Sequence, residues 1–479
     1  MAVTPIAPAT QELTEITLDL GTAQRPSETQ SHVSDRVVRN SARPSATPTA
    51  TVPAQQKMPR LFLSLLYTYF FLMGANYTVV LPTVSTYTHS LGGGYWTAGL
   101  IVAVFMGPSI IITPLMPRLL RSRYMPLFSF AVVCQFVGNV CYGLGQLADS
   151  VNLLIAGRFL AGLVAMGPML YLFIDATSQC SHRQFRTATI ARRNNCAFLG
   201  MGMGPVLAAG LSKVDLQIGS LHVDNLTSPG WFFAVLYVIL LGMTVLVAEP
   251  KRHFAHESDS EQEQPSGSGA ERQRRPVMRN IAWCCLTVTA SSGAISMWET
   301  SAAIVTQTTF GWPVVWSSLF IGALFLSSTI GGELVRHFRH GRTELNIVAI
   351  ALILIFGSSL FLYWYLPKRP DLPQLIGGGE VPYIIGGILL LNAANVCRTF
   401  ATTIAQRTGS SVGAQIRKRT TVAISIAQAI GRTSGALIGL GMMEVNGGMN
   451  IVAAIIGSAS LMMLLALVPD QPRQSLMEA

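Results

Sequence analysis

Residues 345–366 read LNIVAIALILIFGSSLFLYWYL, a run without a single charged side chain. A helix needs about 20 apolar residues to cross the hydrocarbon core of a membrane, so this run has the length of one span. Similar runs recur from Leu61 onward. We expect twelve membrane segments, at about 61–84, 96–117, 126–147, 151–174, 190–211, 230–248, 280–305, 313–334, 345–366, 382–405, 420–443 and 449–468.

The composition of the whole chain agrees with these runs. Charged residues make up 12% of the 479 residues, hydrophobic residues make up 50%, and the mean hydropathy is +0.45. Soluble globular proteins carry about 25% charged residues, so an ordinary soluble enzyme and a disordered protein are both excluded. The formal net charge is +10. We do not expect a nucleic-acid partner, because most of the chain would lie in lipid.

The basic residues gather in alternate loops between the predicted segments. The first such loop holds Arg118, Arg121 and Arg123, and the longest lies between the sixth and seventh segments. The positive-inside rule places these loops and both termini in the cytoplasm. The prediction is an all-α membrane protein with twelve transmembrane helices in two six-helix halves. Its parts are a disordered cytoplasmic segment (1–58), a first half (59–249), a cytoplasmic linker (250–279), a second half (280–469) and a cytoplasmic tail (470–479).

Glycines recur at a spacing of four in the fifth and eleventh segments. They are Gly200 and Gly204 in one, and Gly431 and Gly435 in the other. Two parallel halves related by an axis along the membrane normal would produce such a match. Close packing of helices through small residues explains the same spacing without a transport path.

The fourth and fifth predicted segments each resemble a motif of a known family. The run from Leu153 to Leu163, with Arg158 inside it, resembles the arginine-bearing fourth-helix motif of the major facilitator superfamily. The run from Gly200 to Pro205 resembles the glycine-proline motif of helix 5 in that family. The resemblance implies the major facilitator fold and transport by alternating access. Arg121 stands near the position where the family usually has an aspartate, so the usual cytoplasmic ion pair is not expected.

A closer resemblance covers most of residues 61–469. The stretches 76–83, 138–143, 228–231 and 298–301 are similar, in the same order, to the transporter part of SPX-type vacuolar phosphate transporters. They are also similar to the lysosomal neuronal ceroid lipofuscinosis transporter group. This resemblance implies a vacuolar, lysosomal or other endomembrane transporter. The N-terminal segment is too short and polar for an SPX domain, and residues 164–173 lack the basic residues of phosphate-transporting relatives, so the substrate is left open.

Ionisable groups inside the predicted helices are the main candidates for the transport site, because they are costly in lipid and usually face a cavity or a partner. Burial favours the neutral form of a carboxylate, so Glu299 is the candidate for proton coupling. A structural pair with Arg398 or Arg432 is the alternative for this residue. Arg158 either holds an anionic solute or pairs with a neighbouring helix. The candidate transport path consists of Asn76, Arg158, Arg192, Arg193, Asn195, Arg398 and Arg432.

The remaining candidates lie near the ends of predicted helices. One of Arg192 and Arg193 is expected to point to the cavity and the other to lipid headgroups, unless both extend to the interface. Asp175 and Glu333 are candidates for gating ion pairs. Asn225 begins the glycosylation sequon Asn-Leu-Thr on the non-cytoplasmic side.

The excess of arginine over glutamate inside the helices favours an anion, because the guanidinium fork matches carboxylate and phosphate groups. The prediction is therefore a secondary active transporter of a small anionic solute. Glu299 is its candidate for proton coupling, and no cofactor or metal is expected. The expected partners are membrane lipids and that solute. No catalytic constellation is found, so an enzyme is not expected. A transporter-like structural subunit of a membrane complex is the alternative, and a channel-like anion conductance is a third.

Overall fold

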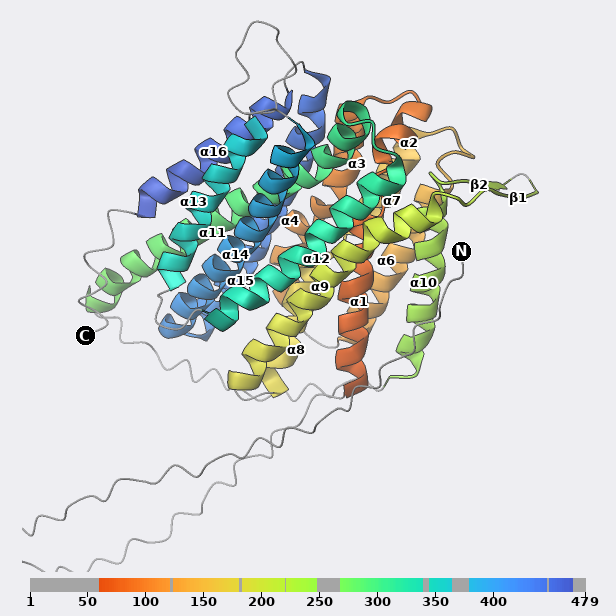
Figure 1. Ribbon diagram of the computed structural model, residues 1–479. Coiled ribbons are helices and arrows are strands. Elements are labelled where there is room, and N and C mark those ends of the chain that lie inside the picture. Colours follow the sequence, from red (N-terminus) through yellow and green to blue (C-terminus); the bar gives the residue numbers. More distant parts are fainter. Residues whose placement is uncertain are drawn as a thin grey trace, which may run out of the picture. The chain divides into compact units, whose positions relative to one another are not determined.

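The computed structural model describes residues 60–120, 124–180, 183–219, 221–247, 268–338, 344–363, 379–445 and 448–467. The described chain is helical apart from one two-stranded hairpin. Ten helices, some of them formed by consecutive shorter helices, are long and apolar enough to cross a membrane. The protein is thus a multi-pass membrane protein (Figure 1).

We call the elements up to residue 247 the N-terminal half and those from residue 268 the C-terminal half. The N-terminal elements are α1 (Arg60–Thr78), α2 (Val84–Ser90), α3 (Tyr95–Met106), α4 (Pro108–Ile112), η1 (Thr113–Leu115), α5 (Met116–Leu119), α6 (Met125–Gly143), α7 (Val151–Gly162), α8 (Met166–Cys180), α9 (Arg183–Leu211), β1 (Leu216–Ile218), β2 (Leu221–Val223) and α10 (Ser228–Val245). The C-terminal elements are α11 (Ser268–Ile304), η2 (Val305–Thr309), α12 (Val314–Phe338), α13 (Glu344–Tyr363), α14 (Glu380–Val412), α15 (Ala414–Gly441), η3 (Met442–Glu444) and α16 (Gly448–Leu467).

Two predicted segments of the N-terminal half are interrupted helices. Pro108 begins α4 directly after Gly107, because proline has no N–H to continue the hydrogen bonds of α3. The break between α7 and α8 follows Gly162, where an added Cβ would meet the backbone of Phe105 in α3. The close approach of α3 and α7 therefore requires glycine at residue 162.

The structure differs from the sequence-based expectation in three places. Helix α11 begins at Ser268, inside the predicted linker, where Ala270, Glu271 and arginines favour a helix. An antiparallel hairpin, β1–β2, lies between α9 and α10 in a chain predicted to be all-α. Helices α1 and α9 are not among the ten membrane-length apolar helices, and the arginines of α9 lower its mean hydropathy. The count of twelve spans therefore stays a prediction.

The two halves meet through matching helix pairs. Helix α9 packs against α1 of its own half and α12 of the other, and α15 packs against α11 of its own half and α3 of the other. In Figure 1, α9 lies between α1 and α12. An added Cβ on Gly202 would meet the Gly322 carbonyl, and one on Gly322 would meet the Gly202 carbonyl. Of the glycines at a spacing of four, Gly200 and Gly204 would meet the backbone of α1 with an added Cβ, and Gly431 and Gly435 would meet that of α11. This contact is the close packing that was the alternative for their spacing.

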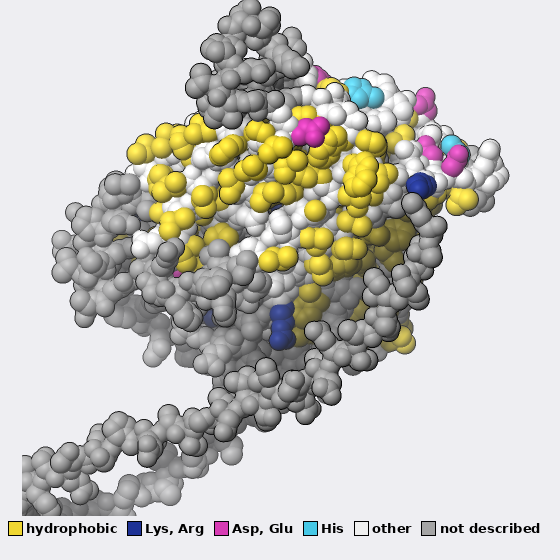
Figure 2. Space-filling view, in the orientation of Figure 1, with side chains coloured by type: hydrophobic (Ala, Val, Ile, Leu, Met, Phe, Trp, Pro, Cys, Tyr) yellow, Lys and Arg dark blue, Asp and Glu magenta, His cyan; other side chains and the backbone are white. Residues whose placement is uncertain are grey.

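The visible surface is suited to lipid contact. Figure 2 shows hydrophobic side chains over the middle of the face in view and the few coloured charged side chains toward its edges. Exposed apolar side chains include Ile239 on α10, Ile353 on α13 and Leu465 on α16. In water this much exposed apolar surface would be unfavourable, whereas in a bilayer it faces hydrocarbon.

Candidate functional site

Glu299 lies at the centre of a polar cluster between the two halves. Its carboxylate Oε1 accepts a hydrogen bond from Arg432 Nη1 at 2.5 Å, and both side chains are 0% exposed. Ser296 Oγ donates to the same oxygen at 3.3 Å. The structure therefore contains the pair with Arg432 that was the structural alternative for Glu299. The second oxygen, Oε2, has no hydrogen-bond partner in the described part of the chain.

Tyr77 connects this ion pair to the N-terminal half. It lies near the end of α1 and donates its hydroxyl hydrogen to Glu299 Oε1 at 2.5 Å. The Arg432 guanidinium carbon lies 5.5 Å from the centroid of the Tyr77 ring. Glu299 on α11 and Arg432 on α15 belong to the C-terminal half, so the Tyr77 hydroxyl joins the two halves at a buried charge. A charged carboxylate accepts such a bond more strongly than a protonated one.

Arg398 and Arg193 approach the cluster from opposite halves. Arg398 on α14 is 6% exposed, and Arg193 on α9 is 4% exposed. Arg398 lies within electrostatic range of Arg193, Arg432 and Glu299. Arg398 Nη2 donates to Asn395 Oδ1 at 3.0 Å, and Arg193 Nη1 donates to the Oδ1 of neighbouring Asn194 at 2.7 Å. Neither guanidinium has a carboxylate partner among the described residues.

Arg158 has a different environment, within the N-terminal half. Its Nη1 donates to the backbone carbonyl of Asn76 at 3.1 Å, and its Nη2 donates to that of Tyr77 at 3.4 Å. These carbonyls belong to the last turn of α1, where backbone acceptors lack helical partners. Arg158 also lies over the Phe105 ring at 4.3 Å. The contacts thus match the structural alternative for Arg158, and its place on the path stays a prediction.

The side chain of Asn76, in α1, makes hydrogen bonds within the N-terminal half next to Arg158. Its Nδ2 donates to Gln135 Oε1 of α6 at 2.9 Å, and its Oδ1 faces Arg158 Nη1 at 3.4 Å. These hydrogen bonds join α1 to α6 and α7, and a place for Asn76 on the transport path stays a prediction. Asn76 is 0% exposed and belongs to the core of the N-terminal half.

The other predicted residues are spread over the molecule. Arg192 is exposed and Arg193 is buried, and the orientation of one toward the cavity and of the other toward lipid headgroups stays a prediction. Asn195 is half-buried on α9. Asp175 Oδ2 accepts a hydrogen bond from the Tyr124 hydroxyl at 2.9 Å. The side chain of Glu333 lies outside the described residues. Asn225 is half-buried in the turn after β2, and its glycosylation stays a prediction.

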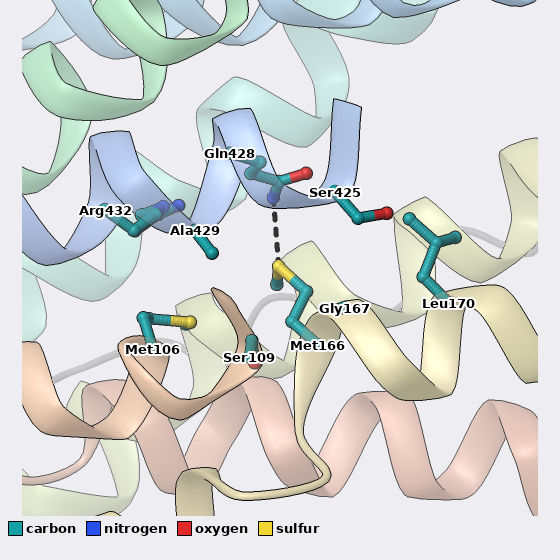
Figure 3. A pocket seen from close by; sticks show the side chains of 9 residues that line it. All are labelled: Met106, Ser109, Met166, Gly167, Leu170, Ser425, Gln428, Ala429 and Arg432. Carbon is teal, nitrogen blue, oxygen red and sulfur yellow. Dashed lines mark hydrogen bonds between the residues drawn. The ribbon is translucent and has the colours of Figure 1, made fainter. Parts of the chain in front are cut away.

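A cavity lies beside Arg432, between the halves. Figure 3 shows Ser109 of α4 and Met166 of α8 on one side, and Gln428 and Arg432 of α15 on the other. Gln428 Nε2 donates to Met166 Sδ at 2.9 Å across this space. Sequence reasoning missed Gln428. An uncharged amide in an apolar helix is a weak signal, and only the face it shares with Arg432, four residues later, could have indicated it.

The halves are also joined at one end of the bundle, the end predicted to be non-cytoplasmic. Glu444 Oε1 in η3 accepts a hydrogen bond from the Trp96 backbone N–H of α3 at 3.2 Å. Gln307 Nε2 in η2 donates to the Pro82 carbonyl at 3.0 Å. Both bonds run from the C-terminal to the N-terminal half. They hold the two halves together at this end of the molecule.

Relatives in plants match part of the chain. An SPX domain-containing membrane protein of Arabidopsis thaliana is 27% identical over 208 residues, which cover 42% of this chain and 29% of that protein. One of Oryza sativa subsp. japonica is 28% identical over 207 residues, which cover 43% and 28%. The chain thus matches less than a third of the length of these curated relatives. The resemblance to the transporter part of the SPX-type proteins is confirmed by these matches.

Solved structures with the same fold are transporters. The human organic anion transporter MFSD10 (TETRAN) is 16% identical with a TM-score of 0.60, covering 86% of this chain and 100% of that one. A D-xylose-proton symporter is 13% identical with a TM-score of 0.64, covering 85% and 97%. A bacterial homologue of the human lysosomal transporter Spinster, inward-facing and occupied, is 13% identical with a TM-score of 0.58, covering 85% and 93%. At these identities the likeness concerns the fold.

The family model for the Major Facilitator Superfamily matches residues 66–415. This range includes α9 and α11 and the greater part of both halves, with Arg193, Glu299 and Arg398 inside it. The chain belongs to the major facilitator superfamily.

Proposed function

We propose that the protein is a secondary active transporter that moves a small anionic solute by alternating access of its two halves. The observation that carries the proposal is the charge balance of the buried cluster. Arg193, Arg398 and Arg432 stand against the single carboxylate of Glu299. Uncompensated buried charge is costly, so such an excess is expected where an anion binds.

Proton coupling follows from the position of Glu299. When charged, its carboxylate holds Arg432 and accepts the Tyr77 hydroxyl, and these contacts link the C-terminal half to the N-terminal half. Protonation would remove the charge that holds both contacts. The halves would then separate more easily at this point, and Arg432 would become available to an anion.

The cellular location is part of the same proposal. The similarity to SPX domain-containing membrane proteins and to a homologue of a lysosomal transporter supports an endomembrane site, vacuolar or lysosomal. A proton gradient exists across such membranes and would drive the solute. A purely structural subunit is disfavoured, because it would retain buried guanidinium groups without a ligand to balance them.

Uptake into proteoliposomes tests this function. The purified protein is reconstituted and offered chloride, phosphate, phosphate esters and small carboxylates, with and without an imposed pH gradient, against protein-free liposomes. We expect saturable uptake of at least one anion, and faster uptake under a pH gradient of one sign than under the other. Absence of flux for every anion from correctly folded protein would contradict transport of this class.

The coupling role of Glu299 has its own test. In Glu299→Gln the side chain keeps its shape and its acceptor for Tyr77 but cannot carry a proton in the cycle. We expect anion exchange without a pH gradient to persist and acceleration by the gradient to disappear. Uptake that still follows the gradient would show that another group couples the proton. Size-exclusion profiles of both proteins serve as the folding control.

A further inference from the structure

The arginines of the buried cluster are not equivalent, because Arg193 and Arg398 have unpaired donors and no carboxylate partner among the described residues, whereas Arg432 is paired with Glu299. Arg193 Nε and Nη2 have no hydrogen-bond partner among the described residues, and neither has Arg398 Nη1. Both side chains are more than nine-tenths buried. Buried polar groups are normally paired, so these three nitrogen donors have unused capacity to bind an acceptor.

Arg158 and Arg432 each keep an unpaired Nε, but their Nη groups are bonded within the protein. Arg432 has its charge balanced by Glu299 at 2.5 Å. Arg158 donates to the last carbonyls of α1 and belongs to the N-terminal half. Arg192, next to Arg193, is exposed. Among the described residues, the uncompensated positive charge of the cluster is therefore that of Arg193 and Arg398.

Aromatic rings fix the orientation of both groups. The Arg193 guanidinium carbon lies 4.1 Å from the centroid of the Phe70 ring, and that of Arg398 lies 4.8 Å from the Phe198 ring. A ring covers one face of each planar group, and guanidinium donors lie in the plane. Phe198 is on α9, so Arg398 of the C-terminal half already rests on the helix that carries Arg193. Arg193 and Arg398 also lie within electrostatic range of each other.

We propose that Arg193 and Arg398 form a two-guanidinium clamp that selects an anion with two negative charges, one guanidinium being supplied by each half. This inference rests on the proposed anion transport and specifies its solute. Two like charges buried at the interface repel each other. An anion with one negative charge would leave one of the two positive charges unbalanced. A dicarboxylate or a doubly charged tetrahedral oxyanion would balance both groups and draw the halves together.

Binding to the purified protein tests the clamp without requiring transport. Two pairs of probes differ by one charge at nearly constant shape: succinate against succinamate, and sulfate against methanesulfonate. We expect the doubly charged member of at least one pair to bind more tightly by about 30-fold or more, measured by titration calorimetry at constant ionic strength. The pair that discriminates identifies a dicarboxylate or a tetrahedral oxyanion.

Variants assign the selectivity to the two residues. Arg193→Gln and Arg398→Gln are each expected to lower the ratio of affinities within the discriminating pair to below about threefold. Arg193→Lys and Arg398→Lys keep the charge and are expected to retain most of the ratio with weaker binding. Arg192→Gln, on the exposed neighbour in α9, is the matched control and should leave the ratio unchanged.

Several outcomes would overturn the clamp. Equal binding of both members in both pairs would do so, and so would an unchanged ratio in Arg193→Gln and Arg398→Gln. Liposome uptake separates this failure from failure of the proposed function. Uptake of monovalent anions without preference for divalent ones would contradict the clamp and support anion transport. Selective binding of divalent anions without uptake would support the clamp and contradict transport.

Discussion

Arg158 and Arg432 are two fully buried arginines, one in each half, and their charges are stabilised in different ways. Arg158 is surrounded by neutral groups, namely the carbonyls at the end of α1 and the Phe105 ring. Arg432 faces a carboxylate, Glu299, which also accepts a hydrogen bond from the other half through Tyr77. The first arrangement lies within one half and contains no carboxylate among the printed contacts of Arg158. The second joins opposite charges and links the two halves through Tyr77.

The largest effect is expected from breaking the charged pair. Glu299→Gln leaves the Arg432 guanidinium buried without a counter-charge, which costs about 3–5 kcal/mol in the free energy of unfolding. Denaturant titration in detergent measures the loss. Glu344→Gln is the matched control, because its partner Arg407 is 66% exposed and such pairs contribute at most about 1 kcal/mol.

A second variant checks the cause of that loss. Adding Arg432→Met to Glu299→Gln removes the unpaired charge, so part of the lost stability should return. A double variant less stable than Glu299→Gln alone would show that contacts of Arg432 other than the ion pair dominate, for example the one with Tyr77.

A smaller effect is expected at Arg158. Arg158→Gln loses charge-assisted hydrogen bonds to the Asn76 and Tyr77 carbonyls but leaves no opposite charge unpaired, so the cost is about 1.5–3 kcal/mol. The same denaturant titration measures it. If Arg158→Gln destabilised the protein as much as Glu299→Gln, the contrast between neutral and charged stabilisation would be broken.

The smallest effect is expected at Gly204 in α9 and Gly435 in α15, which make matching helix contacts in the two halves. An added Cβ on Gly204 would meet α1, and one on Gly435 would meet α11. Overpacking of this kind costs about 1–3 kcal/mol, so Gly204→Ala and Gly435→Ala should lose similar amounts. In α13, an added Cβ on Gly357 meets nothing within 4 Å, and Gly357→Ala is expected to be neutral or stabilising. Unequal losses at Gly204 and Gly435 would mean that the two helix pairs are packed differently.

The buried charged residues could be predicted individually, but their pairing could not. Glu299, Arg398 and Arg432 are each recognisable as a charge inside an apolar run. Which arginine meets Glu299 depends on the rotation of α11, α14 and α15 about their axes, which the sequence pattern does not specify. The contacts of Arg158 could not be predicted for a related reason. Its partners are backbone carbonyls of α1, and these leave no signal in the identity of any side chain.

The sequence by itself determined the membrane-embedded helical class, the superfamily and the few residues whose charge is costly in lipid, because these follow from local hydropathy and short motifs. The tertiary structure decided which charges balance one another. It joins Tyr77 of α1 to Glu299 of α11, and within the described part of the chain it gives Arg193 and Arg398 no carboxylate partner. The physical reason is that a buried charge is stabilised by the groups within a few ångströms of it. In a helix bundle those groups come from segments more than a hundred residues apart.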